Sequence, residues 1–73
     1  MTLDQVPVGS AARLTDTSLH PSTRRLAELG LRPGADVAVL RRISGGGRLI
    51  GLGVARMALD KPTTTSLHVE VSL

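Results

Sequence analysis

A histidine and a glutamate near the C-terminal end are spaced so that they could share a metal ion. His68 and Glu70 are two residues apart, and in a β-strand side chains at this spacing point to the same face. Imidazole and carboxylate groups are common ligands of transition metals, with His20 or Asp16 as a hypothetical third ligand. Because protein metal sites usually have three or four ligands, an exposed polar strand face is the simpler interpretation. We predict no metal site and no cofactor.

Two other groups of residues have the types, but not the arrangement, of enzyme sites. Asp16, Ser18 and His20 are the residue types of a hydrolytic triad, but residues this close in sequence seldom reach the geometry of a triad, which is assembled in space. The pair Gly51-x-Gly53 lacks the third glycine of a dinucleotide-binding loop, and no Gly-Lys-Ser/Thr follows the glycines at 45–47. We therefore predict that the chain is not an enzyme.

Arginine is the most abundant charged residue of the chain. Eight arginines and one lysine outweigh six acidic residues, which gives a net charge of +3. Such a charge permits contact with an acidic protein, nucleic acid or an anionic membrane surface. Phe, Tyr and Trp are absent, so the chain lacks the aromatic side chains on which single-stranded nucleic acids stack. Only sequence-independent phosphate contacts remain, and nucleic-acid binding is the weaker alternative.

The composition predicts one small folded domain over residues 1–73, because no repeat, linker or change in composition divides the chain. A hydrophobic fraction of 41% is typical of folded chains. The absence of cysteine fits a reducing compartment. The N-terminus has neither a basic start nor an apolar run, which argues against a secretory signal. The longest apolar-looking stretch, residues 49–59, is far shorter than the roughly 20 residues of a membrane-spanning helix, so we expect no membrane insertion.

Residues 21–31 predict a short helix with a glycine at its C-terminal end. Leu26 and Leu29 are three residues apart and share one face of a helix that begins at residue 21 or 22. Gly30 can adopt the left-handed conformation that ends a helix. In that arrangement the N–H of Leu31 bonds to the carbonyl of Leu26, and the two leucine side chains pack together.

A tight turn and a series of strands follow this helix. Pro33 and Gly34 suit the two central positions of a type II turn. Alternating hydrophobic residues predict strands at residues 11–15, 36–43, 48–52, 56–59 and 67–73. Arg41 interrupts the inner face of the second strand, which suggests that this strand leaves the core there. We interpret Gly51 and Gly53 as bulge or bend positions, and residues 60–66 as a turn or a single helical turn.

The sequence L-G-L-x-P-G at residues 29–34, between the first and second predicted strands, resembles the central signature of the FeoA family of small proteins of bacterial ferrous-iron uptake. Residues 3–9 resemble the opening turn of that family, residues 57–59 its fourth strand, and Leu67 and Val69 its final strand. The chain departs from the family at Thr64, where alanine is usual, and in the hydroxyl residues around it.

The resemblance implies a mainly β fold: a small SH3-like, five-stranded antiparallel barrel with one short helix inserted between strands 1 and 2. It also implies a non-enzymatic, cytoplasmic accessory that regulates ferrous-iron uptake by docking on the cytosolic part of the membrane transporter FeoB. The link of the family to iron also implies transition metal ion binding. Alternatives are a small basic barrel that binds nucleic acid, and the C-terminal SH3-like domain of an iron-dependent repressor.

We place the docking surface at the end of the helix and in the following turn, where an apolar centre ringed by arginines would make a good interface anchor. The predicted contact residues are Arg24, Arg25, Leu29, Leu31 and Arg32. Leu26, Gly30, Pro33 and Gly34 form the structural motif that supports them. The direction of regulation, the oligomeric state, and the dependence on the partner's nucleotide state stay open.

Overall fold

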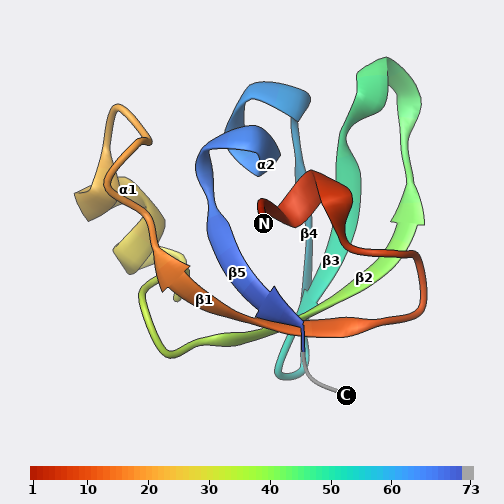
Figure 1. Cartoon of the computed structure of the whole chain (residues 1–73), viewed down its shortest axis with the longest axis horizontal. Coiled ribbons are helices and arrows are strands. Elements are labelled where there is room, and N and C mark those ends of the chain that lie inside the picture. The colour runs from red at the N-terminus through yellow and green to blue at the C-terminus, as the bar shows by residue number, and fades with distance from the viewer. Residues whose placement is uncertain (72–73) are drawn as a thin grey trace.

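A computed structural model describes residues 1–71 of the chain as a five-stranded sheet with short helices (Figure 1). The strands are β1 (Ala11–Asp16), β2 (Asp36–Arg42), β3 (Arg48–Leu52), β4 (Ala55–Leu59) and β5 (His68–Val71). The helices are α1 (Thr23–Glu28) and α2 (Lys61–Ser66), with 3-10 turns η1 (Leu3–Gln5) and η2 (Ser44–Gly46). All neighbouring strands are antiparallel. This confirms the mainly β fold; positions 72 and 73 of the last predicted strand lie outside the described residues.

The sheet is open, so the predicted closed barrel is wrong. The strand order is β4-β3-β2-β1-β5, which leaves β4 and β5 at opposite edges without a pairing between them in the described part of the chain. The connection between them forms α2, which packs against η1 on the inner side of the sheet (Figure 1). Leu3, Thr64 and Leu67 are fully buried there. A backbone hydrogen bond of 2.9 Å from the N–H of Leu3 to the carbonyl of Leu67 holds the N-terminal segment in place.

Helix α2 also corrects the expectation of a single inserted helix. Asp60 caps it by accepting a hydrogen bond from the N–H of Thr63 at 2.9 Å. Hydroxyl groups near its end donate to carbonyls three residues earlier, from Thr64 to Lys61, Thr65 to Pro62 and Ser66 to Thr63, at 2.9, 3.0 and 2.7 Å. The Asp60 cap and a proline in the first turn favour the start of a helix here, and the hydroxyl groups of the segment bond back to carbonyls of the preceding turn.

A bulge in β2 explains the polar interruption at Arg41. Val39 pairs with Ile50 and Arg41 pairs with Leu49, so Leu40 is an extra residue in β2. Val39 and Ile50 are fully buried, whereas Leu40 and Arg41 are both exposed. The strand thus continues past the core with its alternation shifted by one residue. Of the two predicted bulge or bend positions, Gly51 pairs regularly with both Ala38 and Arg56, whereas Gly53 has φ of 60° in the turn between β3 and β4.

The core lies on the inner side of the bent sheet and is almost entirely aliphatic. Its buried residues come from every strand, from α1 and η1, and from loops: Leu3, Val6, Ala12, Leu14, Leu26, Leu31, Val37, Val39, Ile50, Leu59, Leu67 and Val69. Close packing of such side chains stabilises the described part of the fold. No helix within residues 1–71 is long and apolar enough to cross a membrane.

The cap of α2 makes the stability of the domain depend on pH. Hydrogen bonds from the hydroxyl and the N–H of Thr63 lower the pKa of Asp60. A carboxylate with a lowered pKa contributes stability above its unfolded pKa of about 3.9, and this contribution is lost as the pH falls through the lower folded value. We expect Asp60→Ala to lower the melting temperature at pH 7 and to have little effect at about pH 2. Thermal melts across this range measure the difference.

Asp60→Asn is the matched control, because asparagine caps helices about as well as aspartate but does not ionise. It should keep most of the melting temperature at pH 7. An equal loss for Asp60→Ala at both pH values would contradict the assignment.

Candidate functional site

The end of α1 is a rigid cap built around Gly30. This residue has φ of 91°, in the left-handed region that favours glycine. The N–H of Leu31 donates to the carbonyl of Leu26 at 2.9 Å, and the N–H of Gly30 donates to the carbonyl of Ala27 at 2.9 Å. These two bonds define a Schellman motif, and Leu26 and Leu31 both enter the core. The predicted helix end is confirmed.

The turn after the cap is tied to the first strand. The N–H of Ala35 donates to the carbonyl of Arg32 at 3.0 Å, and Gly34 has φ of 93°, as a type II turn requires. The N–H of Gly34 donates to the carbonyl of Leu14 at 2.8 Å, and the N–H of Leu14 returns a bond of 2.8 Å to Ala35. The cap and the turn are thereby held against β1.

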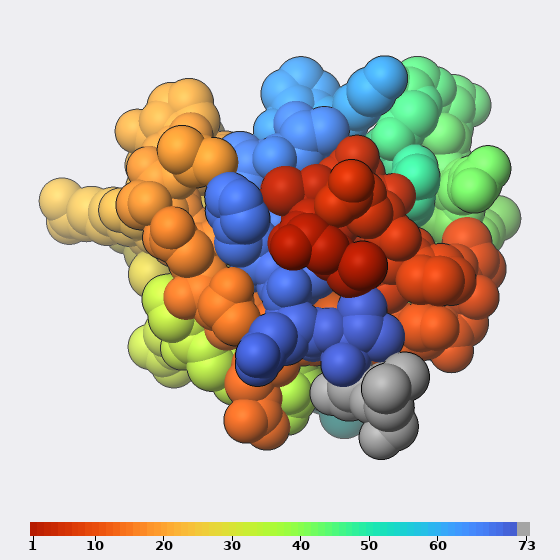
Figure 2. Space-filling view, in the orientation of Figure 1, coloured from red at the N-terminus to blue at the C-terminus, as the bar shows by residue number. Residues whose placement is uncertain are grey.

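The predicted contact residues fall into two groups. Leu29 has 53% of its surface exposed, whereas Leu31 is fully buried in the core. Leu31 therefore supports the cap from within, and its prediction as a direct contact residue is wrong. Arg24, Arg25 and Arg32 are exposed, and Arg24 forms an i,i+4 ion pair with Glu28 at 3.5 Å. The α1 segment projects from one side of the molecule (Figure 2).

The candidate metal ligands do not converge. Among residues 1–71, no three His, Cys, Asp or Glu side chains are placed to hold one metal ion. His68 pairs across the sheet with Asp16, and Glu70 pairs with Arg13. The Nδ1 atom of His68 is buried and has no hydrogen-bond partner in the described region. The structure thus brings His68 close to a single carboxylate.

The residues of the hypothetical triad form two separate local contacts. The N–H and the hydroxyl of Ser18 bond to the carboxylate of Asp16 at 2.8 and 3.0 Å, and these bonds lower its pKa, with a smaller contribution from the charge of His68. The Nδ1 atom of His20 accepts from the N–H of Ser22 at 2.9 Å, ahead of α1. Ser18 therefore bonds to the acid and not to the histidine, which is not the order of a hydrolytic triad.

The glycines at 45–47 have structural roles: Gly45 and Gly46 have positive φ, and Gly47 is packed tightly. A Cβ atom on Gly47 would lie 2.3 Å from the carbonyl oxygen of Leu59, so no larger residue fits there. Arg48 closes the same hairpin, because its guanidinium donates to the carbonyls of Gly46 and Gly47 at 2.9 Å and to that of Asp4 at 3.1 Å. This arginine joins the hairpin to the N-terminal segment and is not a free surface charge.

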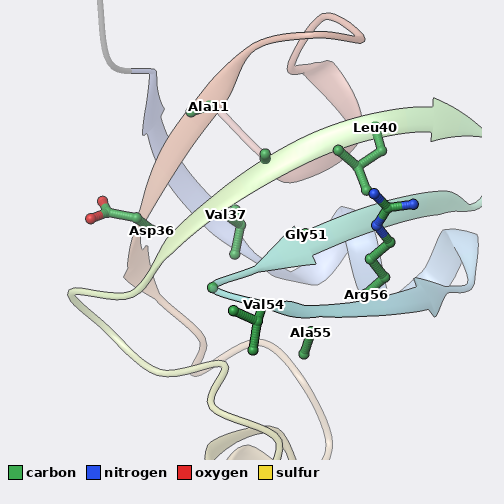
Figure 3. Close-up of a pocket in the computed structure, with 10 residues that line it drawn as sticks. Ala11, Asp36, Val37, Leu40, Gly51, Val54, Ala55 and Arg56 are labelled. Carbon is green, nitrogen blue, oxygen red and sulfur yellow. The ribbon is translucent and has the colours of Figure 1, made fainter.

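The outer face of the sheet carries a groove that sequence reasoning missed. It is open, has a volume of about 550 Å³, and is formed by β2, β3, β4 and the first residue of β1. In Figure 3 the side chains of Leu40 and Arg56 lie side by side across the floor at Gly51, while the carboxylate of Asp36 points away at the other end. Its lining residues are Ala11, Asp36, Val37, Ala38, Leu40, Gly51, Gly53, Val54, Ala55 and Arg56. The bulge at Leu40 places an apolar side chain there, and a single sequence does not reveal a bulge.

These features define a small SH3-like β-protein with a rigid basic cap and an open sheet. The family model described as "FeoA domain" matches residues 1–71, and the chain belongs to this family.

Solved structures share the fold. The chain is similar to an iron uptake regulatory protein, FeoA, with 24% identity, a TM-score of 0.85, and coverage of 99% of this chain and 96% of that one. It is also similar to Stenotrophomonas maltophilia FeoA complexed with zinc, an SH3-domain protein, with 30% identity, a TM-score of 0.77, and coverage of 96% and 89%. The metal-dependent transcriptional regulator MtsR matches with 16% identity, a TM-score of 0.79, and coverage of 100% and 36%. No curated protein sequence matches the chain.

The cap geometry predicts an unequal cost for adding a methyl group at two glycines with the same backbone conformation. Gly30 and Gly34 have φ of 91° and 93°. A Cβ on Gly30 would lie 2.9 Å from the Cδ2 atom of Leu52, whereas a Cβ on Gly34 would meet nothing within 4 Å. Gly34→Ala should cost about 1 kcal/mol of unfolding free energy through backbone strain. Gly30→Ala should cost more, by up to about 1 kcal/mol, because the side chain of Leu52 must shift to make room.

Urea denaturation measures both variants. Leu52→Ala should remove the extra cost of Gly30→Ala in the double variant, because it removes the overlapping atoms. Equal costs for Gly30→Ala and Gly34→Ala, or an additive double variant, would show that the contact with Leu52 does not constrain the cap.

Proposed function

We propose that this chain is a non-enzymatic regulator of ferrous-iron uptake that docks on the cytosolic part of the FeoB transporter through the end of α1. The observation that carries the proposal is the match of the FeoA family over residues 1–71. A similar structure is named an iron uptake regulatory protein, and the Stenotrophomonas maltophilia protein is described as an SH3-domain protein that could act as a ferrous iron transport activating factor. The site of action would then be the cytoplasm.

The shape and charge of the cap support its use as the docking surface. Leu29 exposes an apolar side chain on a helix end whose backbone is held by the bonds of Leu31 and Gly30. Arg25 and Arg32 flank it without an ion pair to any described residue. A fixed apolar centre ringed by arginines loses little conformational entropy on binding and attracts an acidic partner. The docking residues are thus Arg24, Arg25, Leu29 and Arg32, with Leu31 as an internal support.

A regulatory role also agrees with the absence of a reactive cluster among residues 1–71. Asp16, Ser18 and His20 bond within their own loop, and the candidate metal ligands do not converge. The similarity to MtsR lies in the fold, and this chain covers 36% of that transcriptional regulator. The FeoA family match favours the transport regulator over a repressor domain and over a nucleic-acid-binding barrel.

The docking surface is tested by removing its charges. We expect the triple variant Arg24→Ser, Arg25→Ser and Arg32→Ser to weaken binding to the purified cytosolic domain of the transporter by about tenfold or more at physiological salt. Isothermal titration calorimetry gives the affinity, and thermal melts confirm that the variant is folded.

A matched variant separates the surface from the net charge. Arg41→Ser, Arg42→Ser and Lys61→Ser remove the same number of positive charges elsewhere on exposed positions. This control should bind nearly as well as the wild type. An unchanged affinity in the first variant would reject the cap as the docking surface, and binding to DNA that falls steeply with salt would favour the nucleic-acid alternative.

A further inference from the structure

The two edge strands of the sheet differ in whether another segment pairs with them. The N-terminal segment pairs with the free edge of β5, because Thr2 pairs with His68 and the N–H of Val69 donates to the carbonyl of Met1 at 2.9 Å. At the other edge, no residue within 1–71 pairs with β4 except those of β3. β4 is regular along its length, with neither a proline nor a bulge. It lacks two of the devices by which proteins usually block an exposed edge.

The register identifies the backbone groups that β4 presents. A tight two-residue turn, Gly53-Val54, joins β3 to β4 and makes Leu52 and Ala55 a hydrogen-bonded pair. In an antiparallel ladder such pairs recur at every second residue, so Met57 and Leu59 also bond to β3. The N–H and carbonyl groups of Arg56 and Ala58 therefore point away from the sheet. They form a template for one more antiparallel strand.

The side chains along β4 specify what that strand should contain. Arg56 lies on the outer face beside Leu40 and has no ion-pair partner within the described residues (Figure 3). The acid of the groove, Asp36, is already paired with Arg13 at 3.2 Å. On the inner face, Met57 is half-buried and packs against the core. An incoming strand would thus meet an unpaired cation on one face and an apolar side chain on the other.

We infer that β4 binds an extended segment of a partner protein in which acidic residues alternate with apolar ones. The segment would add as an antiparallel strand, with its acidic side chains beside Arg56 and its apolar side chains beside Met57. This site is separate from the cap of α1, and the inference does not rest on docking there.

A second copy of this chain is a poorer occupant. Each copy carries a net charge of +3, and pairing β4 with its own copy around Met57 would place the two Arg56 side chains on the same face as diagonal neighbours. Like charges at this spacing oppose pairing. An acidic segment instead supplies the missing counter-charge.

The probe is a synthetic peptide of alternating glutamate and valine, acetylated and amidated, and one residue longer than β4 at each end. We expect it to bind the full chain and to shift the backbone amide NMR signals of Arg56 and Ala58 most strongly. Arg56→Glu should weaken binding by about tenfold or more. Arg25→Glu, with the same change of net charge on α1, should leave the affinity within about twofold.

The contribution of backbone hydrogen bonds to the affinity is tested by changing the peptide, because this leaves the protein and its folding unchanged. In an antiparallel addition the glutamates face Arg56 and Ala58, and their N–H groups bond to β4, while the N–H groups of the valines point to solvent. N-methylation of the glutamates should abolish binding, whereas N-methylation of the valines should be tolerated. A lysine-valine peptide should not bind.

Three results would overturn the inference. They are no binding up to about a millimolar, shifts that map away from β4, and equal effects of the two N-methylated peptides. Concentration-dependent shifts at β4 without peptide would assign the edge to a second copy instead.

Discussion

The contact between the end of α1 and the β3–β4 hairpin is the constraint on which the rest of the structure depends. Gly30 must be left-handed so that the N–H of Leu31 can reach the carbonyl of Leu26 at 2.9 Å. A Cβ at this position would also lie 2.9 Å from the Cδ2 atom of Leu52, so that side chain would have to shift. The left-handed conformation of Gly30 ends the helix, and its lack of a side chain lets the helix end approach Leu52 of the sheet. The following turn can then bond to β1.

The features that were predicted correctly from the sequence depend on local preferences. Gly30 and Gly34 have left-handed conformations that few other residues adopt, and proline presets φ at position 33, so their spacing specifies the cap and the turn. The alternation of Leu67, Val69 and Val71 likewise specifies a strand. The open sheet and the bulge in β2 were not predicted, because they depend on which distant strands pair, which is a long-range effect. Residues 60–66 were interpreted as a turn or a single helical turn, and the structure has a short helix there.

In the candidate site, too, local features were predictable from the sequence and long-range features were not. Leu29 and Leu31 both fall at the helix end, and the sequence gives no direct measure of their exposure, yet one is 53% exposed and the other fully buried. The glycine between them reverses the direction of the chain, which turns Leu31 toward the core. The groove on the outer face was missed for a different reason: its walls come from four strands, and only the bulge at Leu40 places an apolar side chain beside Arg56.

The open sheet leaves this small chain two candidate surfaces for partners, the proposed docking surface on the cap of α1 and the inferred strand-binding edge at β4. Closing the barrel would pair β4 with β5 and leave only the cap of α1. Here α2 and η1 cover the core, and within residues 1–71 β4 pairs with β3 alone. Leu52 connects these surfaces, because it contacts the position of Gly30 on one side and closes the β3–β4 turn on the other. A strand added to β4 would extend the sheet that supports the cap. The packing that orders the helix end therefore also holds β4 in the extended form that a partner strand requires.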